Sequence, residues 1–180
     1  MASRDDEFTA FAQAASARLL NTAYLLCGDW HTAEDLTQTT LAKVYAAWHR
    51  ITRKDAVHAY AKRTLLNTYF VDCRRTRRGE VLRSTGDLPE RAVEPQATEL
   101  RLTLTDALAM LPPKARAIVI LRYWEDMSVD QVAAQLNCSA GNVKSQSARA
   151  LDKLRSLLDV ALAADRESAL PAISTDPRRH

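Results

Sequence analysis

The chain has little glycine, and it lacks the sequence patterns that are typical of strands. Only 4 of its 180 residues are glycine, and alternating β-branched runs bounded by turn residues are missing. Alanine, leucine, arginine, glutamine and glutamate are abundant, and these residues favour helices. Apolar residues make up 47% of the chain, enough to form real cores. We therefore expect an all-α protein with one large or two small domains.

Cysteines and long apolar runs are also scarce. The three cysteines, at positions 27, 73 and 138, are odd in number and too far apart for a metal clip. We therefore expect reduced thiols, no disulfide framework, no metal and no other cofactor. No stretch approaches the roughly 18 apolar residues of a membrane helix, and the acidic residues 1–7 do not resemble a signal peptide. The expected location is the cytoplasm, with no membrane partner.

Charge is unevenly distributed, although the net charge is only +3. Residues 1–36 contain two basic and six acidic side chains. Residues 50–83 contain three acidic side chains and ten basic ones, Arg50, Arg53, Lys54, Lys62, Arg63, Arg74, Arg75, Arg77, Arg78 and Arg83. Basic residues interleaved with aromatic ones are typical of a nucleic-acid surface, although a solvated helix face would explain part of the pattern.

Two helices separated by a tight turn are predicted in the last third of the chain. Apolar residues repeat at helical spacing over 129–136, and Ser128 forms a capping box with Gln131. Asn137 suits the left-handed conformation of a sharp turn, and Ser139 can cap the helix that follows.

The second of these helices should present a polar face to solvent when Val143 points inward. Small and amide side chains on such a face can approach base edges, and flanking cations can reach phosphates. The pattern predicts a helix-turn-helix that reads DNA, although an ordinary helical hairpin would show the same periodicity. The candidate DNA contacts are Asn142, Lys144, Ser145, Gln146, Arg149 and Lys153.

Three longer helices are predicted in the first half of the chain, over residues 6–27, 32–48 and 55–75. Gly28 should end the first helix, and Thr32 should cap the second with Asp35 in its first turn. Each helix carries an apolar stripe, which we expect to include Tyr45 and Val71. Three such helices make one domain.

The chain is expected to divide into two helical domains. The first domain would span residues 6–78. Residues 79–97 have the turn residues and mixed charge of a flexible linker, which could lie along a basic groove or simply be solvated. The second domain, residues 98–159, would contain two further helices and the helix-turn-helix, and residues 160–180 are expected to form a mobile tail.

Several segments carry a family resemblance when they are taken together in order. They are residues 33–41 (AEDLTQTTL), 63–67 (RTLLN), 111–117 (LPPKARA), 121–123 (LRY) and 143–146 (VKSQ). In this order and spacing the chain resembles the extracytoplasmic-function sigma factors of the sigma-70 family, over about residues 8–158. Residues 27–30 (CGDW) and 87–90 (DLPE), with the overall length, resemble the sigma-E-like branch of actinobacteria.

The resemblance implies a dissociable subunit of RNA polymerase that directs promoter-specific initiation and is not itself an enzyme. The two domains would be sigma region 2 and sigma region 4. Glu34, Asp35 and Gln38 would bind the coiled coil of the polymerase clamp, and Asp35 could also cap its helix and interact with the helix dipole, since both roles can coexist. An anti-sigma factor is a further partner that the resemblance suggests.

The resemblance also implies contacts with promoter DNA. The helix over 55–75 would face the minus-10 element, where exposed bases are captured by stacking and hydrogen bonds. Asn67 would contact a base, and Tyr60 or Phe70 could stack, although core packing is the preferred interpretation for Tyr60. Backbone contacts would come from Lys62, Arg63, Arg74 and Arg75. The helix-turn-helix would read the minus-35 element.

Two other classes of protein are weighed against this interpretation. A stand-alone helix-turn-helix regulator would dimerise on a palindromic site, but the basic first domain and the lack of an apolar stripe beyond Leu158 disfavour it. An enzyme is disfavoured because there is no glycine-rich phosphate loop and no nucleophile–base pair at a recognisable spacing among the candidates His31, His49, His58 and Cys73.

Overall fold

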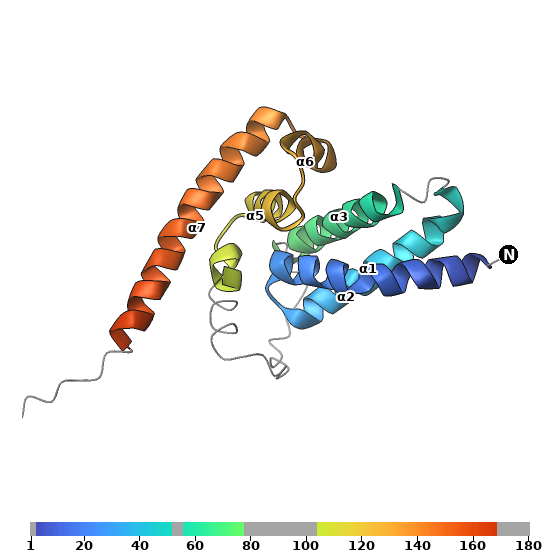
Figure 1. The fold of residues 1–180 in the computed structure, drawn as a ribbon, viewed down its shortest axis with the longest axis horizontal. Helices are drawn as coiled ribbons and strands as arrows, with labels where there is room; N and C mark the ends of the chain where they lie inside the picture. Colours follow the sequence, from blue (N-terminus) through green and yellow to red (C-terminus); the bar gives the residue numbers. More distant parts are fainter. Residues whose placement is uncertain (1–2, 52–55, 78–103, 169–180) are drawn as a thin grey trace, which may run out of the picture.

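The computed structural model describes residues 3–51, 56–77 and 104–168, which are helical apart from short turns (Figure 1). This confirms the all-α fold class. The first unit consists of α1 (Arg4–Cys27), α2 (Trp30–Ala47), the 3-10 helix η1 (Trp48–Arg50) and α3 (Val57–Arg77). The second consists of a helix over 104–109, α5 (Pro113–Val119), the π-helix η3 (Ile120–Trp124), α6 (Val129–Leu136) and α7 (Ala140–Ser168). The linker predicted over 79–97 lies outside the described residues.

Local capping determines where the first two helices begin. Ser3 caps α1 through a capping box with Asp6, so the helix starts two residues earlier than predicted. Gly28, at φ 76°, ends it as expected. The prediction that Thr32 caps α2 is wrong, because Asp29 is the cap and its carboxylate accepts hydrogen bonds from the Thr32 N–H at 2.7 Å and hydroxyl at 2.6 Å. A carboxylate at this position also interacts favourably with the positive end of the helix dipole.

The core of the first unit combines apolar residues with buried threonines. Phe8, Phe11 and Trp48 form an aromatic cluster with ring centroids 5.3 to 6.4 Å apart. Four buried threonine hydroxyls donate to backbone carbonyls four residues earlier in their own helices, so these hydroxyls are satisfied: Thr37, Thr40, Thr64 and Thr68.

Two residues that we placed on the apolar stripes are exposed instead. Tyr45 packs its ring 4.9 Å from Phe8 while its hydroxyl donates to Asp5 at the surface. Val71 of α3 is exposed because the buried side of this helix is shifted towards Leu66 and Tyr69. Leu66 and Tyr69 belong to a core that also contains apolar residues of the second unit.

The helix-turn-helix has the predicted geometry. α6 spans Val129–Leu136, and Ser128 and Gln131 exchange capping-box hydrogen bonds of 3.1 and 2.7 Å. Asn137 follows at φ 49° in the left-handed region. Ser139 accepts a hydrogen bond from the N–H of Asn142 at the start of α7.

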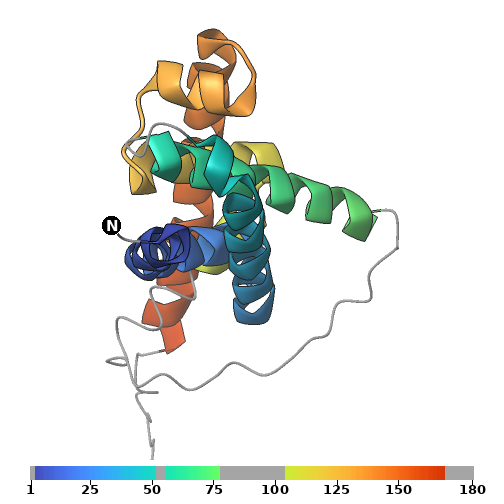
Figure 2. The same cartoon turned by 90° about the vertical axis from the view of Figure 1, so that its right-hand side faces the viewer.

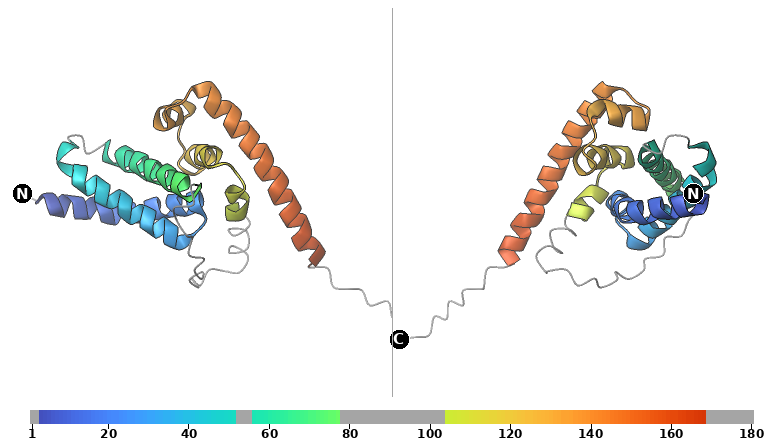
Figure 3. Two further views of the ribbon diagram at one scale, coloured as in Figure 1. Left: turned by 180° about the vertical axis from the view of Figure 1, so that it is seen from behind. Right: turned by 45° about the vertical axis from the view of Figure 1, so that its right-hand side comes forward.

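The last helix is longer than predicted. α7 continues to Ser168, so the tail expected over 160–180 is helical in its first part, and its remainder lies outside the described residues. The second half of α7 extends away from the other described helices (Figures 1 and 3). Leu154 is buried and Leu158 half-buried against the helix over 104–109, whereas Val160 and Leu162 are exposed.

The two units pack directly against each other. α5 and η3 lie against α1 and α3, as the view along the molecule shows (Figure 2). One continuous apolar cluster includes Leu26 and Leu65 of the first unit with Ile118 and Leu121 of the second, all at most 1% exposed. In the described part of the chain the two predicted domains therefore share a core.

Candidate nucleic-acid and protein interface

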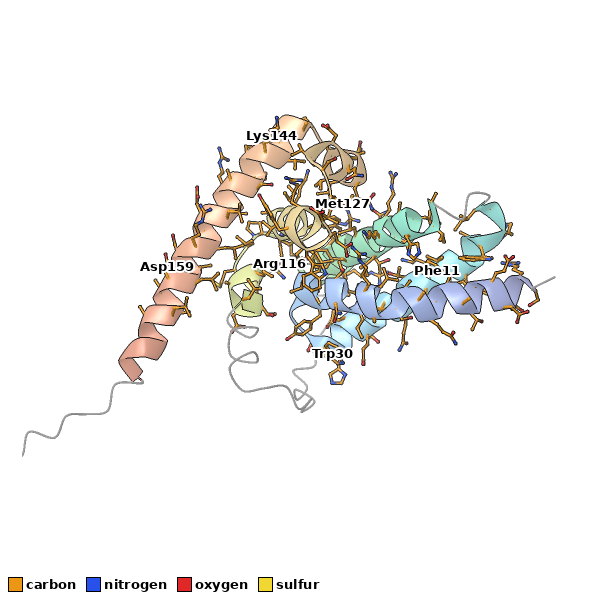
Figure 4. All side chains as sticks on the ribbon, viewed as in Figure 1. Phe11, Trp30, Arg116, Met127, Lys144 and Asp159 are labelled. Carbon is orange, nitrogen blue, oxygen red and sulfur yellow. The ribbon has the colours of Figure 1, made fainter. Side chains whose placement is uncertain are left out.

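The outer face of α7 carries most of the candidate base contacts. Lys144, Ser145 and Arg149 are exposed, and Asn142 and Gln146 are half-buried. The buried side of the helix contains Val143, Ser147, Ala150 and Leu154, as the periodicity predicted. Figure 4 shows Lys144 at the end of α7 that adjoins α6. This is the end at which the two helices of a helix-turn-helix present side chains to a DNA groove.

The candidate DNA-contacting side chains on α7 differ in whether they already make hydrogen bonds within the protein. Lys144 and Arg149 make no hydrogen bond or ion pair with the described residues. Ser145 donates to the carbonyl of Asn142 at 3.1 Å. The Lys153 ammonium donates to the carbonyl of Met110 at 2.9 Å, so this side chain ties α7 to the end of the helix over 104–109.

A second polar face follows α3. Arg63, Asn67 and Arg74 follow one another at spacings of four and seven residues and are all exposed, as is Arg75. The preference for core packing of Tyr60 is wrong, because 39% of this residue is exposed. Phe70, by contrast, is half-buried and its ring lies 5.3 Å from that of Tyr69. Tyr60 therefore offers an exposed stacking surface on the same side of α3 as the candidate base contact, Asn67, about two helical turns away.

Lys62 does not share this face of α3. Its side chain is half-buried, and its ammonium lies 2.5 Å from Oε2 of Glu125, which follows η3 in the second unit. The sequence interpretation missed Glu125 because a single acidic residue next to a turn carries no signal of a partner 63 positions earlier. The structure thus separates Lys62 from the other cations predicted to hold DNA.

Glu125 is an acidic residue buried between the two units. Its side chain is 1% exposed, and it accepts hydrogen bonds from Thr22 Oγ1 at 2.6 Å and from Arg18 Nε at 3.1 Å. Burial by itself raises the pKa of the Glu125 carboxyl, but the hydrogen bonds and positive charge of Lys62, with Thr22 and Arg18, lower it below its ordinary value. Glu125 is therefore ionised at neutral pH.

A third candidate surface lies on α2. Asp35 and Gln38 are exposed one helical turn apart and make no hydrogen bond or ion pair with the described residues. Since Asp29 caps α2, Asp35 has no capping role. Glu34 is half-buried, and its carboxylate accepts a hydrogen bond from Trp30 Nε1 at 3.0 Å. Asp35 and Gln38 are thus more available to a partner than Glu34.

Neither a metal site nor a membrane-spanning helix is found among the described residues. No three histidine, cysteine or acidic side chains there gather closely enough to hold a metal ion. Burial raises the pKa of the Cys27 thiol to about 11, which keeps it protonated and unreactive. None of the helices in the described ranges is long and apolar enough to cross a bilayer.

Both halves of the chain match known protein families. Residues 11–79 match the family described as sigma-70 region 2, and residues 101–154 match the one described as sigma-70, region 4. The chain is 41% identical over 152 residues to the RNA polymerase sigma-E factor of Streptomyces coelicolor, covering 83% of this chain and 84% of that protein. It is 32% identical over 149 residues to the ECF RNA polymerase sigma factor SigE of Mycolicibacterium smegmatis, covering 78% and 57%.

The chain belongs to the extracytoplasmic-function sigma factors of the sigma-70 family. This sigma factor directs promoter-specific initiation by RNA polymerase, and it is not an enzyme. The alternative of a regulator that binds no polymerase is set aside. A solved structure, the sigma factor RpoE in complex with the anti-sigma factor NepR from Bartonella quintana, matches with a TM-score of 0.68 and 25% identity, covering 86% of this chain and 98% of that one.

Proposed function

We propose that this sigma factor uses three separate helices for three contacts. α2 binds the coiled coil of the polymerase clamp, α3 captures the minus-10 element, and α7 reads the minus-35 element. The observation that supports this division is that each helix presents exposed polar side chains with no partner in the described structure: Asp35, Gln38, Arg63, Asn67, Arg74, Lys144 and Arg149. RNA polymerase and the genome lie in the same compartment, so the proposed site of action is the cytoplasm.

On α3, Asn67 and Tyr60 together suit the capture of an unpaired base. A side-chain amide can both donate to and accept from a base edge, and an exposed aromatic ring can stack on the base. Arg63, Arg74 and Arg75 would hold the backbone of the separated strand, because phosphate contacts are largely electrostatic. Lys62 is assigned a weaker part in this surface because Glu125 already pairs with it.

The experiment that tests the proposal is transcription from a genomic promoter library by core polymerase with and without this chain. Start sites that appear only with the chain support the proposal, and their absence contradicts it. The double variant Asp35→Ala/Gln38→Ala should lose binding to core polymerase. Gln13→Ala, which removes an exposed amide from α1, is the matched control and should bind normally.

Regulation by an anti-sigma factor is a further part of the proposed function. The support comes from RpoE of Bartonella quintana, whose solved complex contains the anti-sigma factor NepR and matches most of this chain. A protein that copurifies with the tagged chain and abolishes the sigma-dependent transcripts would support this partner. Copurifying proteins that leave those transcripts unchanged would contradict it.

A further inference from the structure

The contact between the two units of this sigma factor contains a polar network as well as an apolar core. Glu125 lies immediately after η3, and all of its described side-chain partners belong to the first unit. Arg18 and Thr22 approach it from α1, and Lys62 approaches it from α3. One buried carboxylate therefore connects the second unit to two helices of the first.

Arg116 of α5 makes a second polar contact between the two units. One guanidinium nitrogen donates to the carbonyl of Leu26 at 2.6 Å, near the C-terminus of α1 where carbonyls lack helical partners. The other donates at 2.7 Å to the carbonyl of Ala109. Figure 4 shows Arg116 on the side of α5 that faces the first unit. Two charged side chains of the second unit are thus committed to partners in the first.

This closed arrangement is too compact to bind both promoter elements at once. α3 packs on α5, and α5 packs on α7. Packed helix axes lie 8–10 Å apart, so the axes of α3 and α7 are separated by only about 20 Å. The minus-10 and minus-35 elements are named for positions about 25 base pairs apart, which is about 85 Å of B-form DNA at 3.4 Å per base pair. The units must therefore separate before α3 and α7 can engage one promoter.

We propose that Glu125 is an autoinhibitory latch that holds the free sigma factor closed by binding Arg18, Thr22 and Lys62. The inference rests on the proposed function, since closure is inhibitory only if α3 and α7 bind the same promoter. In the closed state the Lys62 ammonium is paired with protein instead of being available to a phosphate. Binding to core polymerase opens the latch by holding the two units apart.

The latch differs from ordinary surface ion pairs in its burial. A carboxylate that is removed from water needs its partners, and removing the charge leaves the half-buried Lys62 ammonium without a counterion. When the units separate, water solvates all of these groups. The conservative change Glu125→Gln therefore destabilises the closed state selectively and leaves the open state unaffected.

The test is small-angle X-ray scattering by the full chain without polymerase. Glu125→Gln should increase the radius of gyration, and wild type should match the compact structure. The matched control is Asp152→Asn, because Asp152 pairs with Arg155 at 3.3 Å within α7 and both side chains are 74% exposed. The control should scatter as wild type does.

Binding to a promoter duplex that contains both elements provides the second readout. Glu125→Gln should bind at least about tenfold more tightly than wild type in the absence of polymerase. The reason is that the apparent affinity is proportional to the fraction of molecules that are open. A variant that remains compact and binds DNA as wild type does overturns the latch. If Glu125→Gln loses helical content in circular dichroism, Arg18→Gln replaces it, since Arg18 is 63% exposed. Unchanged scattering by folded Arg18→Gln would then overturn the proposal.

Transcription by the reconstituted holoenzyme separates failure of the latch from failure of the proposed function. Wild type that produces no promoter-specific transcript with core polymerase contradicts the proposed function, whatever the scattering shows. Wild type that transcribes while Glu125→Gln stays closed contradicts the latch alone.

Discussion

Asn137 shows how one residue can determine the geometry of a DNA-reading surface. It ends α6 at φ 49° and lets the chain turn sharply into α7. Asparagine tolerates this left-handed conformation better than other residues that carry a Cβ, and glycine tolerates it at no steric cost. The angle between the two helices of the motif therefore depends on the identity of this residue.

Substitutions of Asn137 should separate conformational strain from other effects. Asn137→Val should lower the free energy of unfolding by about 1–2 kcal/mol, because a β-branched residue is strained at positive φ. Asn137→Gly should change it much less. Thermal denaturation of both variants measures the difference, and equal melting temperatures would contradict a role of backbone strain in this turn.

On the outer face of α7, Arg149 and Lys144 should affect DNA binding differently. If Arg149 makes a bidentate contact with guanine, Arg149→Ala costs about 1–3 kcal/mol on the matched promoter and relaxes selectivity at one position. Lys144→Ala should weaken binding to all sequences alike and reduce the dependence on salt. Titrations with matched and scrambled minus-35 duplexes at several salt concentrations measure both effects. An equal loss by Arg149→Ala on the two duplexes would rule out base reading by this side chain.

At the scale of helices, local sequence signals were sufficient for most of the architecture. The bounds of α6 were predicted correctly because its capping box and apolar repeat lie within nine residues. The cap of α2 was misplaced by three residues because Asp29 and Thr32 are both good capping residues, and only the structure shows which carboxylate or hydroxyl accepts the hydrogen bond. The length of α7 was underestimated because alanine and leucine beyond position 160 continue the helix without a stop signal.

The cap of α2 provides a test of the stability of this helix, for which we propose binding to polymerase. Asp29→Ala should lower stability by about 1 kcal/mol, because it removes the side-chain acceptor for the N–H of Thr32. Asp29→Asn keeps an acceptor and should recover most of that loss. Chemical denaturation measures both variants. If the two variants are equally destabilised, the charge of Asp29 matters more than its hydrogen bond.

At the scale of the whole molecule, sequence reasoning found the two helical units but not their packing. Ile118 and Leu121 are recognisable as core residues, yet nothing local shows that Leu26 and Leu65 share that core. The partners of Glu125 are likewise invisible to periodicity, since Arg18 is 107 positions away from it. The candidate DNA residues could be predicted because they lie on local helical faces, whereas the position of Lys62 depends on the arrangement of both units.

The charge of Glu125 makes the closed state sensitive to acid. The pKa of its carboxyl is lower in the closed state than its ordinary value of 4.5, so the contact contributes fully above about pH 4.5 and is lost as the pH falls through the lower, closed-state pKa. Protonation of Glu125 removes the counterion of Arg18 and Lys62, which approach it from α1 and α3 of the first unit, and so weakens the contact between the two units. Wild type should therefore expand when the pH is lowered below 4.5.

Scattering between pH 7 and pH 3.5, in about half-unit steps, should show this expansion for wild type. Glu125→Gln should already be expanded at pH 7 and should change less on acidification, because it has no carboxyl to protonate at the interface. His58 lines the same cavity as Glu125 and is present in both chains. Circular dichroism at each pH shows whether the helices persist. Expansion with the same midpoint in wild type and Glu125→Gln would assign the acid response to other carboxyls, and the interface would then be held mainly by its apolar core.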